Sequence, residues 1–227
     1  MLKSSLALAA AALAVTLPVS AIAQEAAAEA ETASTFKYEP VNYNLDEDRE
    51  NILFLDLSNG ERVGIRLMPA WAPNHVERIK TLASQGFYNG IIFHRVIEGF
   101  MAQTGDPTGT GQGSSPLPDL EEEFNPMPHI RGTLSMARAA SEDSANSQFF
   151  IVFYPRFSLD KKYTNFGRVI SNMAAVDAIN RGEPPANPTR ILQASMASEN
   201  KPVPAPMPDA APANMGEEEI TLDDLNS

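Results

Sequence analysis

The stretch FHRVIEGFMAQTGDP, residues 93–107, contains two of the short apolar runs that decide the fold class, and each run carries a polar residue. Side chains two positions apart on a β-strand share a face, so Phe93 should pair with Arg95 and Met101 with Gln103. The pattern therefore predicts an apolar face with a guanidinium and an amide set into it.

Similar short runs, separated by turns, continue on both sides of this stretch. NILFLDL (51–57) and RVGIRL (62–67) flank an Asn59-Gly60 pair, which is a strong signal of a β-hairpin. Further strands are expected at IIFHR, FMAQ, GTLSMA, SQFFIVF, NFGRVI and TRILQAS.

Two segments have the apolar periodicity of helices. The first should begin at Asn74, in a capping pair with Glu77, and end at Gly86. The second should run from about Asn172 to Gly182. Many short strands with only two helices favour an all-β barrel or sandwich over a doubly wound sheet, with the helices covering open ends.

The run SQFFIVF predicts which side chains leave the core. Phe149 and Ile151 should point inward, and Gln148 and Phe150 outward. If three such strands are neighbours, their outer faces form an apolar patch that holds one guanidinium and two amides. Patterning alone leaves open the alternative that Arg95 only extends its charge into solvent and that the aromatic residues belong to the core.

The first 23 residues have the three parts of a signal peptide. Lys3 gives the positive start, LALAAAALAV the apolar centre, and Ala21-Ile22-Ala23 the cleavage site. A retained membrane anchor is the competing interpretation, but the apolar run is shorter than the roughly 18 residues needed to span a bilayer, and Pro18 ends it. We expect export to a bacterial periplasm, with full secretion as the alternative.

Two low-complexity segments should flank one folded domain. Residues 24–44 are expected to be an Ala/Glu-rich linker, and residues 197–227 a proline-rich, acidic, disordered tail that either solubilises the protein or docks elsewhere. The domain would then span residues 45–196, a length that can bury a sizeable core.

The composition excludes several classes of partner and of chemistry. The chain has 29 acidic and 17 basic residues, a formal net charge of -12, and no cysteine. Such a surface repels nucleic acid and anionic membranes, so neither is expected as a partner once the signal peptide is removed. Without disulfides, an exported domain must be stable on its hydrophobic core alone.

Other motifs give little support for further sites. Glu121-Glu122-Glu123 should be solvated, and His75, His94 and His129 lack the spacing of metal ligands, so no metal is expected. The run GTGQG (109–113) lacks the lysine of a phosphate loop and the dinucleotide fingerprint, and is expected to be a flexible loop.

Four motifs in this order resemble the cyclophilin family of peptidyl-prolyl cis-trans isomerases. They are FHRVIEGFMAQTGDPTGTG, GTLSMARA, SANSQFFI and LDKKYTNFGRV. The resemblance covers roughly Asn51 to Leu192. It implies a mainly β fold, a closed eight-stranded antiparallel barrel capped by two helices, and a cofactor-free, monomeric enzyme that acts on proline-containing peptides and unfolded protein segments.

The same resemblance implies a set of site residues, with Arg95 as the catalytic one. The substrate-binding residues would be Phe100, Met101, Gln103, Ala137, Arg138, Ala139, Gln148, Phe150, Leu159 and Tyr163. Ser158 and Tyr163 depart from the tryptophan and histidine of many eukaryotic members, which puts cyclosporin binding in question more than catalysis. Arg138 stands where an asparagine is common.

Two rival functions stay open at this point. A chaperone or scaffold that binds proline-containing segments, with incidental turnover, would use the same groove. A lipocalin-like carrier would need a hollow barrel, and the bulky inward residues Phe149 and Ile151 argue against it. The favoured function is an isomerase that accelerates the folding of exported proteins.

Overall fold

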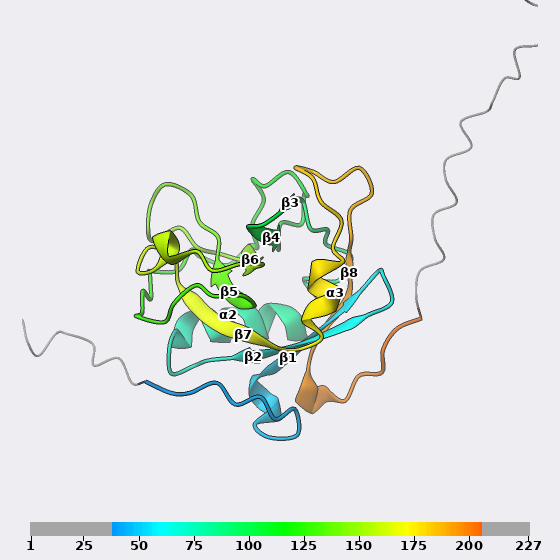
Figure 1. Cartoon of the computed structure of the whole chain (residues 1–227), viewed down its shortest axis with the longest axis horizontal. Coiled ribbons are helices and arrows are strands. Elements are labelled where there is room, and N and C mark those ends of the chain that lie inside the picture. The colour runs from blue at the N-terminus through cyan, green and yellow to red at the C-terminus, as the bar shows by residue number, and fades with distance from the viewer. Residues whose placement is uncertain (1–37, 206–227) are drawn as a thin grey trace, which may run out of the picture. The chain divides into compact units, whose positions relative to one another are not determined.

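A computed structural model describes residues 38–205 of the chain. This part contains eight strands and two α-helices. The strands pair antiparallel in one sheet, in the order β3-β4-β6-β5-β7-β2-β1-β8 (Figure 1). The strands are β1 (Ile52–Leu57), β2 (Arg62–Leu67), β3 (Arg95–Ile97), β4 (Met101–Thr104), β5 (Thr133–Met136), β6 (Phe149–Val152), β7 (Asn165–Ser171) and β8 (Ile191–Met196). The helices are α2 (Pro73–Ser84) and α3 (Met173–Asp177).

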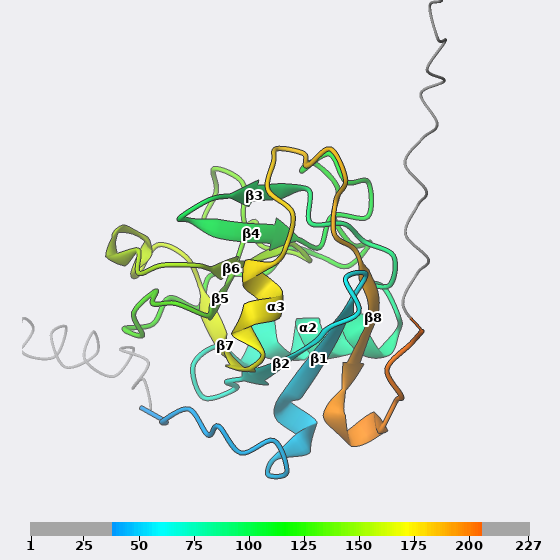
Figure 2. The ribbon, with the colours of Figure 1, turned by 45° about the vertical axis from the view of Figure 1, so that its right-hand side comes forward.

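The sheet curls into a half-barrel whose edge strands are β3 and β8 (Figure 2). The closed barrel that the resemblance implies is not what the described residues form, because no ladder joins these two edges. Single bridges cross the gap instead, from Ile92 to Arg190 and from Val96 to Gly182. The free edge of β8 meets residues 90–93, which lie before β3, and β3 itself has only three residues, so no regular ladder forms.

The predicted hairpin is confirmed. β1 and β2 pair antiparallel, and the turn between them is closed by hydrogen bonds from Leu57 N to Glu61 O and from Gly60 N to Leu57 O, both 2.9 Å. Gly60 has φ 86°, a conformation that side chains other than that of glycine rarely adopt.

The main core lies on the inner face of the sheet and under α2. Phe149 and Ile151 are inside it, as expected, with 0% and 1% of their surface exposed. Phe93 is also fully buried there, so its predicted pairing with Arg95 on one face is wrong. The reason is local: β3 begins only at Arg95, and the residues just before it do not alternate as in a strand.

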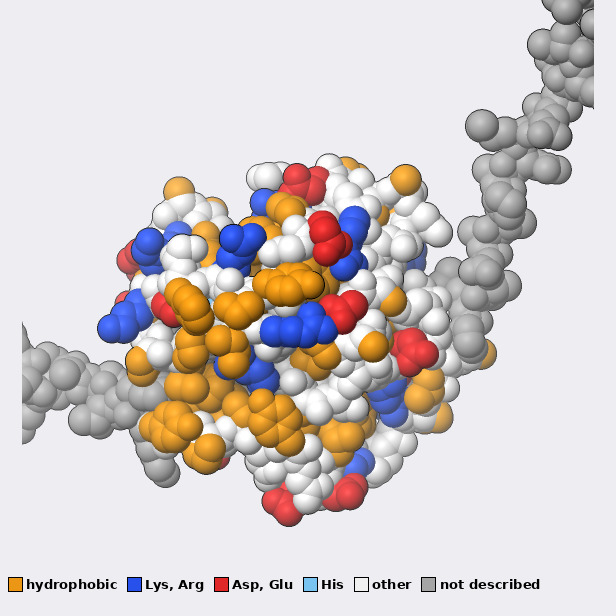
Figure 3. Space-filling view, in the orientation of Figure 1, with side chains coloured by type: hydrophobic (Ala, Val, Ile, Leu, Met, Phe, Trp, Pro, Cys, Tyr) orange, Lys and Arg blue, Asp and Glu red, His pale blue; other side chains and the backbone are white. Residues whose placement is uncertain are grey.

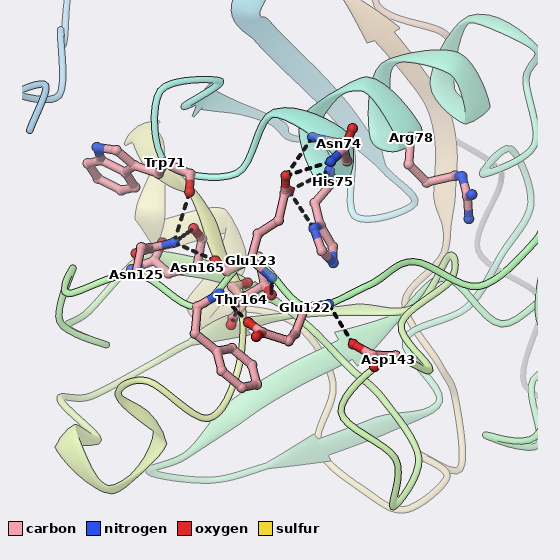
Figure 4. Close-up of polar contacts among 12 residues, drawn as sticks. Trp71, Asn74, His75, Arg78, Glu122, Glu123, Asn125, Asp143, Thr164 and Asn165 are labelled. Atoms are coloured by element: carbon pink, nitrogen blue, oxygen red, sulfur yellow. Dashed lines mark hydrogen bonds and ion pairs between the residues drawn. The ribbon is translucent and has the colours of Figure 1, made fainter. Parts of the chain in front are cut away.

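The start of α2 differs from the expected capping pair of Asn74 and Glu77. The helix begins at Pro73, a residue favoured at this position, and no side chain at its N-cap accepts a hydrogen bond. Instead, Glu123 from a distant loop accepts hydrogen bonds from Asn74 N at 3.1 Å and His75 N at 3.0 Å (Figure 4). Glu123 therefore satisfies amides that the helix itself leaves unpaired.

Glu123 is thus not the solvated carboxylate that its sequence context predicts. Its side chain is 14% exposed, and its Oε2 lies 2.7 Å from His75 Nδ1. Burial raises the pKa of Glu123, but the hydrogen bonds from His75 and Asn74 outweigh burial and leave the pKa below its ordinary value. Asn172, where the second helix was expected to begin, caps α3, and its side chain accepts a hydrogen bond from Ala175 N. The expected end of this helix at Gly182 is wrong: α3 ends at Asp177, and Gly182 instead forms a bridge with Val96 of β3.

The flanking segments are described only in part. The expected signal peptide lies outside the described residues, and of the linker and the tail only residues 38–44 and 197–205 lie within them. The buried Arg66 side chain donates hydrogen bonds to the carbonyls of Asn42 and Asn44, so this part of the linker contacts the sheet. Within residues 38–205, no helix has both the length and the apolar character needed to cross a bilayer.

Candidate active site

Three neighbouring strands place Arg95, Gln103 and Phe150 in one row. Arg95 of β3 lies opposite Gln103 of β4, and Gln103 lies opposite Phe150 of β6. Residues directly opposite each other on adjacent strands share a face, so these three side chains emerge together. The prediction of an outer patch that mixes apolar and polar groups is confirmed.

An apolar cluster separate from the main core surrounds this row. Met101, Phe150 and Val152 form it, and Phe100, Leu159 and Tyr163 are among the partly buried residues packed against it. Figure 3 shows hydrophobic side chains gathered across one face of the molecule, with Lys and Arg side chains set among them.

A pocket of about 140 Å³ opens in this cluster, and we call it the Arg95 pocket. It is lined by Arg95, Phe100, Met101, Gln103, Ala137, Arg138, Phe150, Leu159 and Tyr163. An apolar cavity of about 150 Å³ can hold a benzene ring, so a ring the size of proline fits here.

Aromatic contacts shape the wall of the Arg95 pocket. Tyr163 packs edge-to-face on Phe150, with ring centroids 5.8 Å apart, and His129 stacks behind Phe150. Tyr163 is therefore an integral part of the pocket wall. Phe157, next to Ser158 in sequence, is 63% exposed and does not line the pocket.

The Arg95 guanidinium lies at the rim of the pocket and is partly open to solvent. Its side chain is 43% exposed, and its Nε donates a 2.8 Å hydrogen bond to Glu183 Oε1, a carboxylate that is itself half exposed. Neither Nη group has a hydrogen-bond partner among residues 38–205. The guanidinium is therefore neither turned into the core nor held by a buried acid.

A second pocket of about 350 Å³ adjoins the first, and we call it the Gln148 pocket. Gln103, Ala137 and Arg138 line both pockets, and Ala139 and Gln148 line the second. Gln103 Nε2 donates to Gln148 Oε1 at 2.9 Å, and Gln148 Nε2 donates to Gly113 O at 2.8 Å. The two amides thus form an ordered chain along the groove.

Each residue that the resemblance implies for the site lines one of these two pockets. Their individual roles in substrate binding or catalysis stay predictions, because the geometry alone does not assign them. The family to which the chain belongs is decided by comparison with known proteins.

A family model described as "Cyclophilin type peptidyl-prolyl cis-trans isomerase/CLD" matches residues 54–196. The chain belongs to this family. Curated relatives agree: a "Probable peptidyl-prolyl cis-trans isomerase" of Brucella suis is 44% identical over 170 residues, which cover 68% of this chain and 86% of the relative. The enzyme class is therefore cyclophilin-type peptidyl-prolyl cis-trans isomerase.

Solved cyclophilins share the fold. The crystal structure of cyclophilin AquaCyp293 from Hirschia baltica matches with a TM-score of 0.63 and 27% identity, over 73% of this chain and 84% of that one. A Cryptosporidium parvum cyclophilin, crystallised in the presence of the dipeptide Ala-Pro, matches with a TM-score of 0.59 and 27% identity, over 64% of this chain and 98% of that one.

One wall of the cyclophilin groove was missed by the sequence analysis. The loop with the GTGQG run, expected to be flexible, lines the Gln148 pocket and is held by Asp106, which accepts hydrogen bonds from Thr108 N at 2.7 Å and Gly111 N at 2.5 Å. Burial raises the pKa of Asp106, but hydrogen bonds from Thr108, Gly113 and Gly111 outweigh it and bring the pKa to about 2. An Asp side chain often accepts from the backbone N–H two residues later, so Asp106 was a signal that could have indicated an ordered turn here.

Arg138 braces the wall that the two pockets share. Its Nε and Nη2 both donate to Lys162 O, at 3.2 and 3.1 Å, and its Nη1 donates to Ala139 O at 3.1 Å. Its guanidinium carbon lies 4.9 Å from the centroid of the Tyr163 ring. These contacts occupy the guanidinium, so Arg138 joins two loops of the groove while it lines both pockets.

The histidines do not form a metal site within the described part of the chain, where no three His, Asp or Glu side chains gather. His94, next to Arg95 in sequence, is buried, and neither ring nitrogen has a hydrogen-bond partner there. Burial lowers the pKa of His94; the charge of Asp106 opposes this effect, and that of Arg95 adds to it. The buried surroundings of His94 therefore favour its neutral form.

Proposed function

We propose that this cyclophilin accelerates rotation about X-Pro bonds while exported proteins fold, with Arg95 as the catalytic residue. The observation that carries the proposal is the position of the Arg95 guanidinium: it lies at the rim of a pocket of proline size, directly opposite Gln103. Unpartnered Nη groups at that rim are free to donate hydrogen bonds to a bound peptide.

The chemistry of the reaction explains why arginine is useful there. The barrier of about 18–20 kcal/mol comes from amide resonance, which delocalises the nitrogen lone pair into the carbonyl. Twisting the bond returns the lone pair to the prolyl nitrogen. A donor aimed at that nitrogen then binds the twisted state better than either planar state, and each 1.36 kcal/mol of such preference gives about a tenfold rate increase.

The neighbouring side chains would hold the rest of the substrate still. In this mechanism the proline ring fills the Arg95 pocket against Phe150 and Met101. Gln103, oriented by its hydrogen bond to Gln148, donates its remaining N–H to a substrate carbonyl. Rotation about one bond needs such fixed points on either side of it. Arginine stays protonated at every physiological pH, so no proton transfer is involved.

The substrate class follows from the same groove. We propose that it takes proline-containing peptides and unfolded protein segments, and the relative crystallised in the presence of Ala-Pro supports this choice. A binder without turnover is the competing function. It would show affinity for a prolyl peptide without accelerating its isomerisation.

Substitution of Arg95 tests the mechanism. We expect Arg95→Ala to lower kcat/KM for a prolyl peptide by roughly 10²–10³, the effect of removing one donor that acts in a transition state. The protein should stay folded, since the side chain is half exposed. A protease-coupled peptide assay with circular dichroism as the control measures both. Unchanged turnover would refute the role of Arg95.

The pH profile provides a second measure of the same mechanism. Because no proton is transferred in this mechanism, the rate should be nearly flat between about pH 6 and 8, where neither carboxylates nor arginine titrate. A steep bell-shaped profile in that range would contradict a mechanism based on a permanent cation.

The place of action is the remaining part of the proposal. The signal-like residues 1–23 support export, to a bacterial periplasm or out of the cell. The mature chain should then begin near Gln24. N-terminal sequencing of the protein from a periplasmic fraction would check this. An intact Met1 in the cytoplasmic fraction would contradict it.

A further inference from the structure

Arg95 has one side-chain partner among the described residues, and this partner comes from the far end of the chain. Glu183 lies 88 residues away in sequence and accepts a 2.8 Å hydrogen bond from Arg95 Nε. Neither residue pattern nor spacing indicated Glu183. It is not among the residues that line either pocket, so it contacts the guanidinium from outside the groove.

The backbone fixes Glu183 in this place. Val96, next to Arg95, and Gly182, next to Glu183, exchange two hydrogen bonds: Val96 N to Gly182 O at 2.8 Å and Gly182 N to Val96 O at 2.9 Å. Gly182 has φ 143°, and a Cβ there would lie 2.5 Å from Pro185 Cα, so only glycine fits the bridge. The carboxylate is therefore held beside β3 by the main chain.

The contact with Glu183 uses only Nε of the guanidinium. It restricts the orientation of the guanidinium and leaves both Nη groups without a partner among residues 38–205. An exposed arginine otherwise samples many rotamers, and fixing it costs free energy each time it acts. A partner that fixes it beforehand removes part of that cost from the reaction.

We propose that Glu183 is the positioning residue of Arg95, which orients the guanidinium for the twisted peptide and so raises kcat without strengthening substrate binding. The inference rests on the proposed role of Arg95. The expected effect is on kcat and not on KM, because the apolar wall holds the proline ring and Glu183 does not line that wall.

A second ion pair of the same kind provides a matched control. Glu98 Oε2 accepts a 2.7 Å hydrogen bond from Arg181 Nε, and both side chains are partly exposed. Arg181 does not line the Arg95 pocket. If Glu183 only stabilises the surface, the two glutamates should behave alike, since exposed ion pairs contribute little.

The experiment measures kcat and KM separately for the full chain and its variants on one prolyl peptide. Glu183→Ala should lower kcat about threefold, with a limit near fivefold for an exposed pair, and leave KM unchanged. Glu183→Gln keeps an acceptor oxygen and should restore most of the rate. Glu98→Ala should match the wild-type protein.

A double-mutant cycle then separates positioning from any independent role. If Glu183 acts through Arg95, Glu183→Ala should have no effect in the Arg95→Ala background. An equal loss in both backgrounds, a change in KM alone, an unchanged kcat in Glu183→Ala or an equal loss in Glu98→Ala would each overturn the inference. Failure of the proposed function is distinct, because it would appear as a wild-type protein without turnover or an Arg95→Ala variant with full turnover.

Discussion

The two faces of strands β4 and β6 are built from alternate residues of the same short runs, but they differ in what covers them. On the inner face, Ala102, Phe149 and Ile151 are at most 1% exposed and belong to the main core. On the outer face, Phe150 belongs to a small separate cluster in which a pocket stays open, and Gln103 is its direct neighbour.

This difference shows which apolar residues serve folding and which serve binding. The inner face completes its contacts within the protein, so its burial contributes directly to the free energy of folding. The outer face keeps a cavity and unpaired donors that a ligand would complete, as binding sites in general do. Substitutions on the two faces should therefore change different measured quantities.

The largest expected effect is on the inner face. Phe149→Ala should lower the free energy of unfolding by about 3–5 kcal/mol, because it removes buried surface and leaves a cavity that the core cannot fill. Urea unfolding followed by circular dichroism measures this change. Phe149→Leu, which keeps most of the volume, should lose less than about 1.5 kcal/mol. If Phe149→Ala lowered the free energy of unfolding by less than about 1 kcal/mol, the inner face would not be the face that stabilises the fold.

Phe150, the next residue in the chain, should affect activity more than stability. Phe150→Ala opens a pocket that water already reaches, so we expect about half the loss of stability of Phe149→Ala. Its kcat/KM should fall at least about tenfold, since the proposed mechanism packs the proline ring against Phe150. Peptide turnover and urea unfolding of the same preparation give both numbers. Equal losses of stability with full activity would contradict the assignment of the two faces.

A smaller effect is expected from the loop of the Gln148 pocket. The pKa of Asp106 is about 2 in the folded protein and about 3.9 in an unfolded chain. Its carboxylate therefore stabilises the fold fully above about pH 4, and this contribution is lost as the pH falls through 2. Asp106→Asn should unfold at lower urea than the wild type at pH 6. The difference should shrink between pH 4 and pH 2, and a constant difference would exclude the ionised carboxylate as its cause.

The smallest effect should come from the helix cap, which lies away from both pockets. Glu123→Ala should cost about 1 kcal/mol of unfolding free energy, because the first amides of α2 lose their acceptor. Its kcat/KM should match the wild type. Glu122→Ala is the matched control: its side chain is exposed and should change stability by less than about 0.5 kcal/mol. A loss of activity in Glu123→Ala would extend the site beyond the groove.

Much of the site could be predicted because it depends on local alternation within single strands. Met101 and Gln103, or Phe149 and Phe150, are assigned to faces by a period of two, whatever the rest of the chain does. The hairpin at Gly60 and the apolar stripe of α2 are local in the same sense. Phe93 shows the limit of this reasoning, because β3 begins only at Arg95 and Phe93 lies before it.

Contacts between distant segments could not be predicted in this way. Glu123 and Glu183 each stand in polar, proline-flanked sequence that is typical of solvated loops. Each becomes specific only because the fold brings it to an amide or a guanidinium far away in the chain. No propensity or spacing contains that information.

The sequence by itself determined most of the strands, the faces of the side chains in β4 and β6 and, through four linked motifs, the cyclophilin family. The tertiary structure decided that the sheet stays a half-barrel, that Arg138 braces two loops, and that Glu183 holds Arg95. The physical reason is the distance along the chain over which each kind of interaction acts. Alternation and turn geometry act over a few residues, whereas register between strands and the meeting of loops are settled by packing of the whole chain.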